Sequence, residues 1–201
     1  MKKYILFIFF IFYFSQFVYS ADINGYVGGN LGQASTDTGV SGTTGTADLD
    51  EEDLGWKIYG GANLNEYLAI EVQYADFGEA TLSGNVNDTF VIDNTTLQFL
   101  TTAELILDGD SFGFSGVVGY DINEYIRPYA RLGGHLWDST FSVAAGGLSA
   151  TIADDDGFDI FYGFGVKIKI SEQLSAVAEY ENYGFDEDDV ELFTAGIQLT
   201  F

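Results

Sequence analysis

The chain has 201 residues, a formal net charge of −24 and no cysteine. Such an excess of acid excludes nucleic-acid binding by phosphate neutralisation, and the lack of cysteine excludes a disulfide framework. With 25 glycines, 13 tyrosines and 18 phenylalanines but 1 proline, the composition differs from that of a disordered chain, in which aromatic residues are scarce.

The first twenty residues have the pattern of a secretory signal peptide. Lys2 and Lys3 precede an apolar run over 4–14, and Val18-Tyr19-Ser20 is compatible with cleavage after Ser20. The run is shorter than the roughly 20 residues that a membrane-spanning helix needs. We therefore predict a signal peptide at 1–20 and one mature domain at 21–201, in which five basic residues face 31 acidic ones.

The rest of the chain is a series of segments in which apolar and polar residues alternate, as in β-strands. We place eight strands at 22–32, 54–64, 67–77, 112–122, 125–138, 158–170, 173–183 and 190–201. Two-residue polar turns at 65–66, 123–124 and 171–172 alternate with longer, acidic connections at 33–53, 80–111, 139–156 and 184–189. This alternation is typical of outer-membrane barrels, whose tight turns lie in the periplasm and whose longer loops lie outside.

We therefore predict an all-β fold, an eight-stranded antiparallel up-and-down transmembrane β-barrel with both termini periplasmic. Residues 80–111 leave an alternative open, because strand-like stretches at 86–92 and 95–107 would make ten strands. Since 86–92 is shorter than the roughly 9–11 residues of a membrane strand, we favour an extracellular hairpin extension. The last strand ends on Phe201, a terminal aromatic similar to the C-terminal signature of such barrels.

Several motifs also resemble one family. They are G-Y-V-G-G-N-L-G at 25–32, Y-G-G-A-N-L-N-E-Y at 59–67, A-I-E-V-Q-Y at 69–74, R-P-Y-A-R-L-G-G-H-L-W at 127–137, A-E-Y at 178–180, and Phe201. In their order and spacing the mature chain resembles the OmpA-like transmembrane-domain family of small outer-membrane barrels. The resemblance implies contact with outer-membrane lipid and lipopolysaccharide, and insertion by the barrel assembly machinery, which reads Phe201; it implies no cofactor. Because no peptidoglycan-binding domain follows the barrel, we expect no tethering to the cell wall.

The alternation directs one set of charged residues into the lumen. It comprises Glu71, Arg131, His135, Lys167 and Glu179. Buried charges must be paired, so the set forms either a structural plug or a gate for ions. Because side chains about fill the interior of an eight-stranded barrel, we favour the plug. The same alternation places Trp56 and Trp137 on the lumen side.

A hydrolase is the least favoured function. Some eight-stranded barrels are lipid A deacylases with a His/Ser pair on the lipid face, and His135 is the only histidine here. Its alternation directs it inward, and Ser139 lies in a predicted loop. We therefore predict no enzymatic activity.

Acidic residues gather at the predicted outer end. They are Asp154, Asp155, Asp156, Asp186, Glu187, Asp188 and Asp189. Carboxylate oxygens are ligands for Ca²⁺ or Mg²⁺, but the spacing of a defined calcium loop is missing, and a solvated charged face is the simpler interpretation. We predict a structural, envelope-integrity role with acidic extracellular loops. The alternatives are a surface adhesin or host-factor receptor using 33–53 and 80–111, with an unknown external protein ligand, and a low-conductance ion channel.

Overall fold

The computed structural model describes residues 24–92, 94–186 and 188–201, and the predicted signal peptide lies outside these ranges. All regular structure in the described ranges is β-strand. They hold no helix of the length and apolarity needed to cross a membrane.

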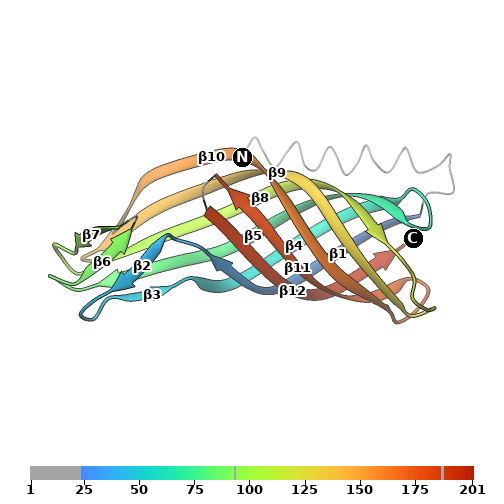
Figure 1. Cartoon of the computed structure of the whole chain (residues 1–201), viewed down its shortest axis with the longest axis horizontal. Helices are drawn as coiled ribbons and strands as arrows, with labels where there is room; N and C mark the ends of the chain where they lie inside the picture. The colour runs from blue at the N-terminus through green and yellow to red at the C-terminus, as the bar shows by residue number, and fades with distance from the viewer. Residues whose placement is uncertain (1–23, 93, 187) are drawn as a thin grey trace.

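Eight strands form a closed barrel (Figure 1). They are β1 (Gly25–Thr36), β4 (Glu52–Asn63), β5 (Leu68–Gly84), β8 (Ala103–Gly119), β9 (Ile126–Ala145), β10 (Leu148–Lys169), β11 (Leu174–Phe185) and β12 (Asp188–Thr200). Each pairs antiparallel with the next, and β1 pairs with β12 to close the wall. The predicted eight-stranded up-and-down barrel is confirmed, and the ten-stranded alternative is excluded.

Large apolar side chains cover the outside of the barrel wall. Leu132 and Phe193, for example, are 64% and 62% exposed, and similar residues stand on the outer face of β1, β4, β5, β8 and β10. Soluble proteins rarely expose a continuous apolar band of this extent. A lipid environment accounts for it, because the outer face of a membrane barrel carries such a band.

The two tryptophans lie on opposite sides of the wall. Trp137 is 7% exposed and lies inside, as predicted. The prediction for Trp56 is wrong: it is 38% exposed on the outer face, with its ring centroid 5.6 Å from that of Tyr74. The inward residues of β4 are Gly55, Lys57 and Tyr59, because successive strand residues alternate between faces.

The three predicted tight turns lie at one end of the barrel. The side chains of Asn65 and Asn123 each accept two backbone N–H bonds, at 2.8 and 2.9 Å for Asn65 and at 2.8 and 3.0 Å for Asn123. Ser171 Oγ accepts a similar bond from the Leu174 N–H at 3.2 Å. These bonds are the reason that Asn and Ser favour turns. Phe201 lies at the same end, where its backbone exchanges bonds of 3.1 and 2.9 Å with Gly25.

At the other end, most of the predicted loops are strands. Residues 139–156 continue β9 and β10 as a paired hairpin that turns at Gly146 and Gly147, whose φ angles are +60° and +80°. Within 184–189, Gly184 and Phe185 belong to β11 and pair with Asp189 and Asp188 of β12. Every residue of β10 from Leu148 to Asp156 is exposed. Without a buried face, the hairpin needs no apolar alternation, and its sequence therefore has the composition of a loop.

A second, three-stranded sheet completes this end of the molecule. It consists of β2 (Val40–Thr43), β6 (Thr89–Ile92) and β7 (Thr95–Gln98), while β3 (Asp48–Asp50) pairs with the outer part of β5. Leu82, Phe90 and Phe99 form a small core between this sheet and the outer parts of β5 and β8. The predicted hairpin within 80–111 is confirmed, and 33–53, predicted as a loop, contributes two of these strands. We call the part of the molecule that holds β2, β3, β6 and β7 the extension. Figure 1 shows it far from the C-terminus.

Asp88 holds the extension together. Its carboxylate accepts hydrogen bonds from Thr46 Oγ1 at 2.6 Å and from the Asn85 N–H at 2.8 Å. These bonds favour the ionised form and hold the pKa of Asp88 below its usual value. The stabilisation is therefore complete above the usual pKa of an aspartate and is lost as the pH falls through the lowered pKa.

We expect Asp88→Ala to loosen the second sheet without opening the barrel. Amide hydrogen exchange should accelerate in residues 89–98 and stay slow in β11 and β12, because local stability varies between cooperative units. Asp154→Ala, an exposed carboxylate on β10, is the matched control and should leave both rates unchanged. Equal exchange in Asp88→Ala and the control would contradict this role.

Candidate functional site: an ion-pair network in the barrel lumen

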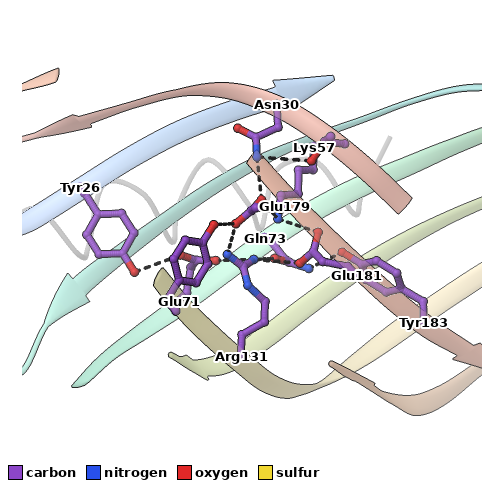
Figure 2. A network of polar contacts seen from close by, with 11 residues as sticks. Tyr26, Asn30, Lys57, Glu71, Gln73, Arg131, Glu179, Glu181 and Tyr183 are labelled. Atoms are coloured by element: carbon purple, nitrogen blue, oxygen red, sulfur yellow. Dashed lines mark hydrogen bonds and ion pairs between the residues drawn. The ribbon is translucent and has the colours of Figure 1, made fainter. Parts of the chain in front are cut away.

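Five buried charged residues meet inside the barrel (Figure 2). Arg131 of β9 lies 2.8 Å from Glu71 of β5 and 2.9 Å from Glu181 of β11, and it also pairs with Glu179. Lys57 of β4 lies 2.5 Å from Glu179 and 2.6 Å from Glu181. The network therefore crosses the lumen and connects four strands of the wall.

Neutral polar groups donate further hydrogen bonds to the carboxylates. Asn30 Nδ2 donates to Glu179 at 2.6 Å, Tyr26 OH donates to Glu71 at 2.9 Å, and Tyr129 OH donates to Glu179. Glu71 Oε1 contacts Arg131 only as an ion pair, without the alignment of a hydrogen bond. Buried ions with this many partners are stable together, but the loss of one partner exposes the others to an uncompensated desolvation cost.

A glutamine links the network to the next layer of the lumen. Gln73 Oε1 accepts from Arg131 at 2.7 Å, and Gln73 Nε2 donates to Tyr183 OH at 2.6 Å. Tyr183 in turn stacks on Phe161, with ring centroids 5.0 Å apart. The network is therefore continuous with an aromatic layer above it, and side chains fill this part of the lumen.

The structure brings together three of the five predicted lumen residues, Glu71, Arg131 and Glu179. Lys167 lies beside them without an ion pair to any described carboxylate. Its Nζ stands 4.5 Å from the ring centroid of Tyr26 and 5.0 Å from that of Tyr129, within the range of cation–π interactions. With Lys167 included, three positive charges balance the three carboxylates of the network.

His135 belongs to a different layer. Its Nδ1 lies 2.9 Å from Ser111 Oγ and its Nε2 lies 2.9 Å from the Gly184 carbonyl oxygen. Aromatic rings surround it, including Phe161, Tyr183 and Phe185. The histidine points inward, as predicted, and its hydroxyl partner is Ser111 rather than Ser139.

The sequence interpretation missed Lys57 and Glu181, both of which are fully buried. Glu181 stands two residues after Glu179 on the same face, and this spacing was a sufficient signal. Lys57 was missed because the assignment of Trp56 to the lumen side places Lys57 on the lipid side. Because the inward and outward faces of β4 were exchanged in the prediction, the predicted network lacked one cation.

The predicted acidic residues do not act as one set. Asp155, Asp186 and Asp188 line a cavity at the extension end of the barrel, together with Asp37 and Asp108. Asp154, Asp156 and Asp189 do not line it, and Glu187 lies outside the described residues. In the part of the chain that the structure describes, no group of three or more His, Cys, Asp or Glu side chains is arranged to hold a metal ion.

Comparison with known proteins agrees with this architecture. Residues 20–189 match the family model of the OmpA-like transmembrane domain. Outer membrane protein A of Klebsiella pneumoniae is 29% identical over 163 residues, which cover 78% of this chain and 42% of that protein. The chain thus spans about two fifths of the length of this curated relative.

Solved structures show the same fold at low sequence identity. OprG of Pseudomonas aeruginosa superposes with a TM-score of 0.59 at 10% identity, covering 89% of this chain and 95% of that one. Ail, the attachment invasion locus protein of Yersinia pestis, gives a TM-score of 0.55 at 17% identity, covering 89% and 98%. From the family match over most of its length, the chain belongs to the OmpA-like transmembrane-domain family of outer-membrane β-barrel proteins.

Proposed function

We propose that this protein is a structural component of the outer membrane, a closed barrel that contributes to envelope integrity. The ion-pair network carries the proposal. Lys57 and Arg131 are bound to the same two glutamates of β11 from opposite parts of the wall. Such a network braces the barrel from within and fills the space that a pore would need.

We further propose that the short turns and both ends of the mature chain lie in the periplasm and that the extension lies outside. Outer-membrane barrels have this asymmetry of short periplasmic turns and long external connections. Phe201 then lies at the periplasmic rim, where we propose that the barrel assembly machinery reads it. Lipopolysaccharide would contact the outer half of the apolar wall.

A strain that lacks the protein tests the structural role. We expect it to leak periplasmic enzymes and to become sensitive to detergents. We also expect complementation by the full chain and by a variant in which a short turn replaces residues 86–101, because both keep the barrel and its network. A strain with an intact envelope would contradict the structural role.

A surface-binding role is the second candidate. It is supported by the extension, which places a second folded sheet beyond the barrel. In this case, the variant trimmed at 86–101 would keep the envelope intact but lose adherence to host cells or matrix proteins. Equal adherence of the full and trimmed chains would exclude these residues as an adhesin.

A low-conductance channel is the third candidate. Its support is that two cations share three carboxylates in the lumen, so more than one pairing can exist there. If the network gates ions, Glu71→Gln or Lys167→Gln would change the conductance in planar bilayers. If it is a structural plug, neither neutral substitution would produce a stable open level.

A further inference from the structure

The outer half of β10 lies at the border of the strands that protrude past the closed barrel (Figure 1). On one side it pairs with β9, from Leu148 to Ile168. On the other side β11 pairs with it only from Phe161 onward. Among the described residues, no strand pairs with that side of β10 between positions 148 and 160. The outer half of β10 therefore has an open side, which we call the free edge.

Two bonds near the short turns show which backbone groups point to the free edge. The N–H of Lys169 donates to the Tyr125 carbonyl on the β9 side at 2.7 Å. The N–H of the next residue, Ile170, donates to the Leu174 carbonyl on the β11 side at 2.9 Å. Successive N–H groups of a strand point to opposite sides, and the pairing with β9 is regular over this length. The N–H groups of the even-numbered residues within 154–160 therefore point to the free edge.

Two of these edge donors bond to the aspartate that precedes them. The N–H of Asp156 donates to the Asp155 carboxylate at 2.9 Å, and the N–H of Ile160 donates to the Asp159 carboxylate at 2.7 Å. These bonds satisfy the donors without a neighbouring strand, and charged side chains along an edge discourage pairing with further copies of the same sheet. A strand that carries positive charges would meet attraction at this edge instead of repulsion.

The side chains along the free edge define the chemistry of such a strand. Asp154, Asp155 and Asp156 are all exposed, and alternation places Asp155 on one face of β10 and the other two on the opposite face. The ion pairs of the described lysines and arginines involve other carboxylates. Nearer the hairpin tip, the edge carries the apolar Ile152 and Leu148, which are 61% and 80% exposed. The edge is thus acidic in its lower part and apolar toward its tip.

We propose that the free edge binds an extended basic segment of another protein as an additional antiparallel strand. Strand addition to an open edge is a general mode of peptide recognition, in which backbone bonds give affinity and side chains give specificity. Lysines or arginines of the segment pair with the aspartates, and the N–H of Asp156 then donates to the backbone of the segment. Because the segment runs opposite to β10, its basic residues lie in its N-terminal half and its apolar residues in its C-terminal half.

This surface is independent of the structural role and of residues 86–101, since it uses neither the membrane wall nor the second sheet. A trimmed chain that lost adherence would therefore leave the free edge intact. Loss of binding at the free edge would likewise leave the envelope intact, so the two proposals fail separately.

Binding of a synthetic peptide to the wild-type protein, folded in vesicles of uncharged phosphatidylcholine, tests the proposal. The probe has roughly nine residues, within the usual length of a strand. Threonines alternate with lysines in its N-terminal half and with valines in its C-terminal half. The control peptide has the same side chains and charge, but each of its backbone amide nitrogens is methylated and cannot donate a hydrogen bond.

We expect saturable binding of the probe and binding of the methylated peptide that is weaker by about tenfold or more, the loss expected when backbone bonds are removed. Attraction by charge alone would act on both peptides. The absence of saturation with the probe, or equal binding of the two peptides, would overturn the proposal.

Two substitutions at one residue separate the edge from its charge. Asp154→Asn removes the charge alone and should weaken binding of the probe by up to about fivefold, as for an exposed ion pair. Asp154→Pro removes the same charge together with an N–H that points to the free edge, and a proline is tolerated at such a position. We expect a further loss of about tenfold in Asp154→Pro.

Asp48→Asn is the control for charge, because Asp48 is an exposed aspartate of β3, at the opposite border of the protruding strands. It should change the affinity for the probe by less than about twofold. The slower migration of each variant after heating, compared on the same gel with the wild-type protein, verifies that the barrel is folded. Equal affinities of the folded Asp154→Asn and Asp154→Pro variants would overturn the proposal.

Discussion

Arg131→Met is expected to lower the free energy of unfolding by about 3–5 kcal/mol, the usual cost of removing one partner from a buried ion network. The guanidinium group pairs with Glu71, Glu179 and Glu181, and both of its donors to these residues are buried. Methionine fills a similar volume but leaves Lys57 as the only described cation that forms ion pairs with these carboxylates. Urea unfolding of the protein folded in phospholipid vesicles measures the loss.

Arg127→Met is the matched control. Arg127 pairs with Asp121 at 3.0 Å near a short turn, where both side chains reach solvent. Exposed pairs of this kind contribute about 0–1 kcal/mol. If the two variants lost similar stability, or if Arg131→Met lost less than about 1 kcal/mol, the network would not brace the barrel.

Leu132→Arg is expected to cost about 2–4 kcal/mol, the range for a cation on the lipid face at the midplane of a membrane barrel. Leu132 is 64% exposed and stands midway along the outward apolar row of β9 that runs from Ile126 to Leu136. In water an exposed arginine would change the stability little, so a large loss of stability indicates lipid outside the wall. Folding free energy in vesicles is again the measurement.

Leu148→Arg provides the comparison for the lipid-facing substitution. Leu148 is 80% exposed at the tip of the β9–β10 hairpin, beyond the apolar band. Exposed surface substitutions usually change stability by less than about 0.5 kcal/mol. Equal, small effects at both leucines would contradict a lipid environment around Leu132.

The membrane wall was predictable because its two environments impose a pattern on the sequence. Lipid outside and a packed lumen inside force alternation, as in β12, where Leu192 and Thr194 are buried and Phe193 is exposed. The turns were predictable because Asn65 and Asn123 bind the local backbone. Each of these signals lies within a few neighbouring residues.

The β9–β10 hairpin and part of the network could not be predicted in the same way. Residues 148–156 have water on both sides, so pairing with β9 leaves no mark on their apolar pattern. The contacts of Lys57 join residues more than 120 positions apart. They depend on which residues of β4 face the lumen and on the register of four strands. In β4 the aromatic Trp56 lies outside and the charged Lys57 lies inside. Without knowledge of the partner strand, the sequence was compatible with either residue facing the lumen.

Single-channel recording of the wild-type protein in planar bilayers tests the closed lumen most directly. Because the network of Lys57, Glu71, Arg131, Glu179 and Glu181 crosses the barrel, we predict insertion without discrete conductance steps. Insertion is verified in the same membranes by protease protection of the β10 hairpin or the opposite turns. Steady single-channel currents through the inserted wild-type barrel, unchanged in Arg131→Met, would contradict a lumen closed by its ion pairs.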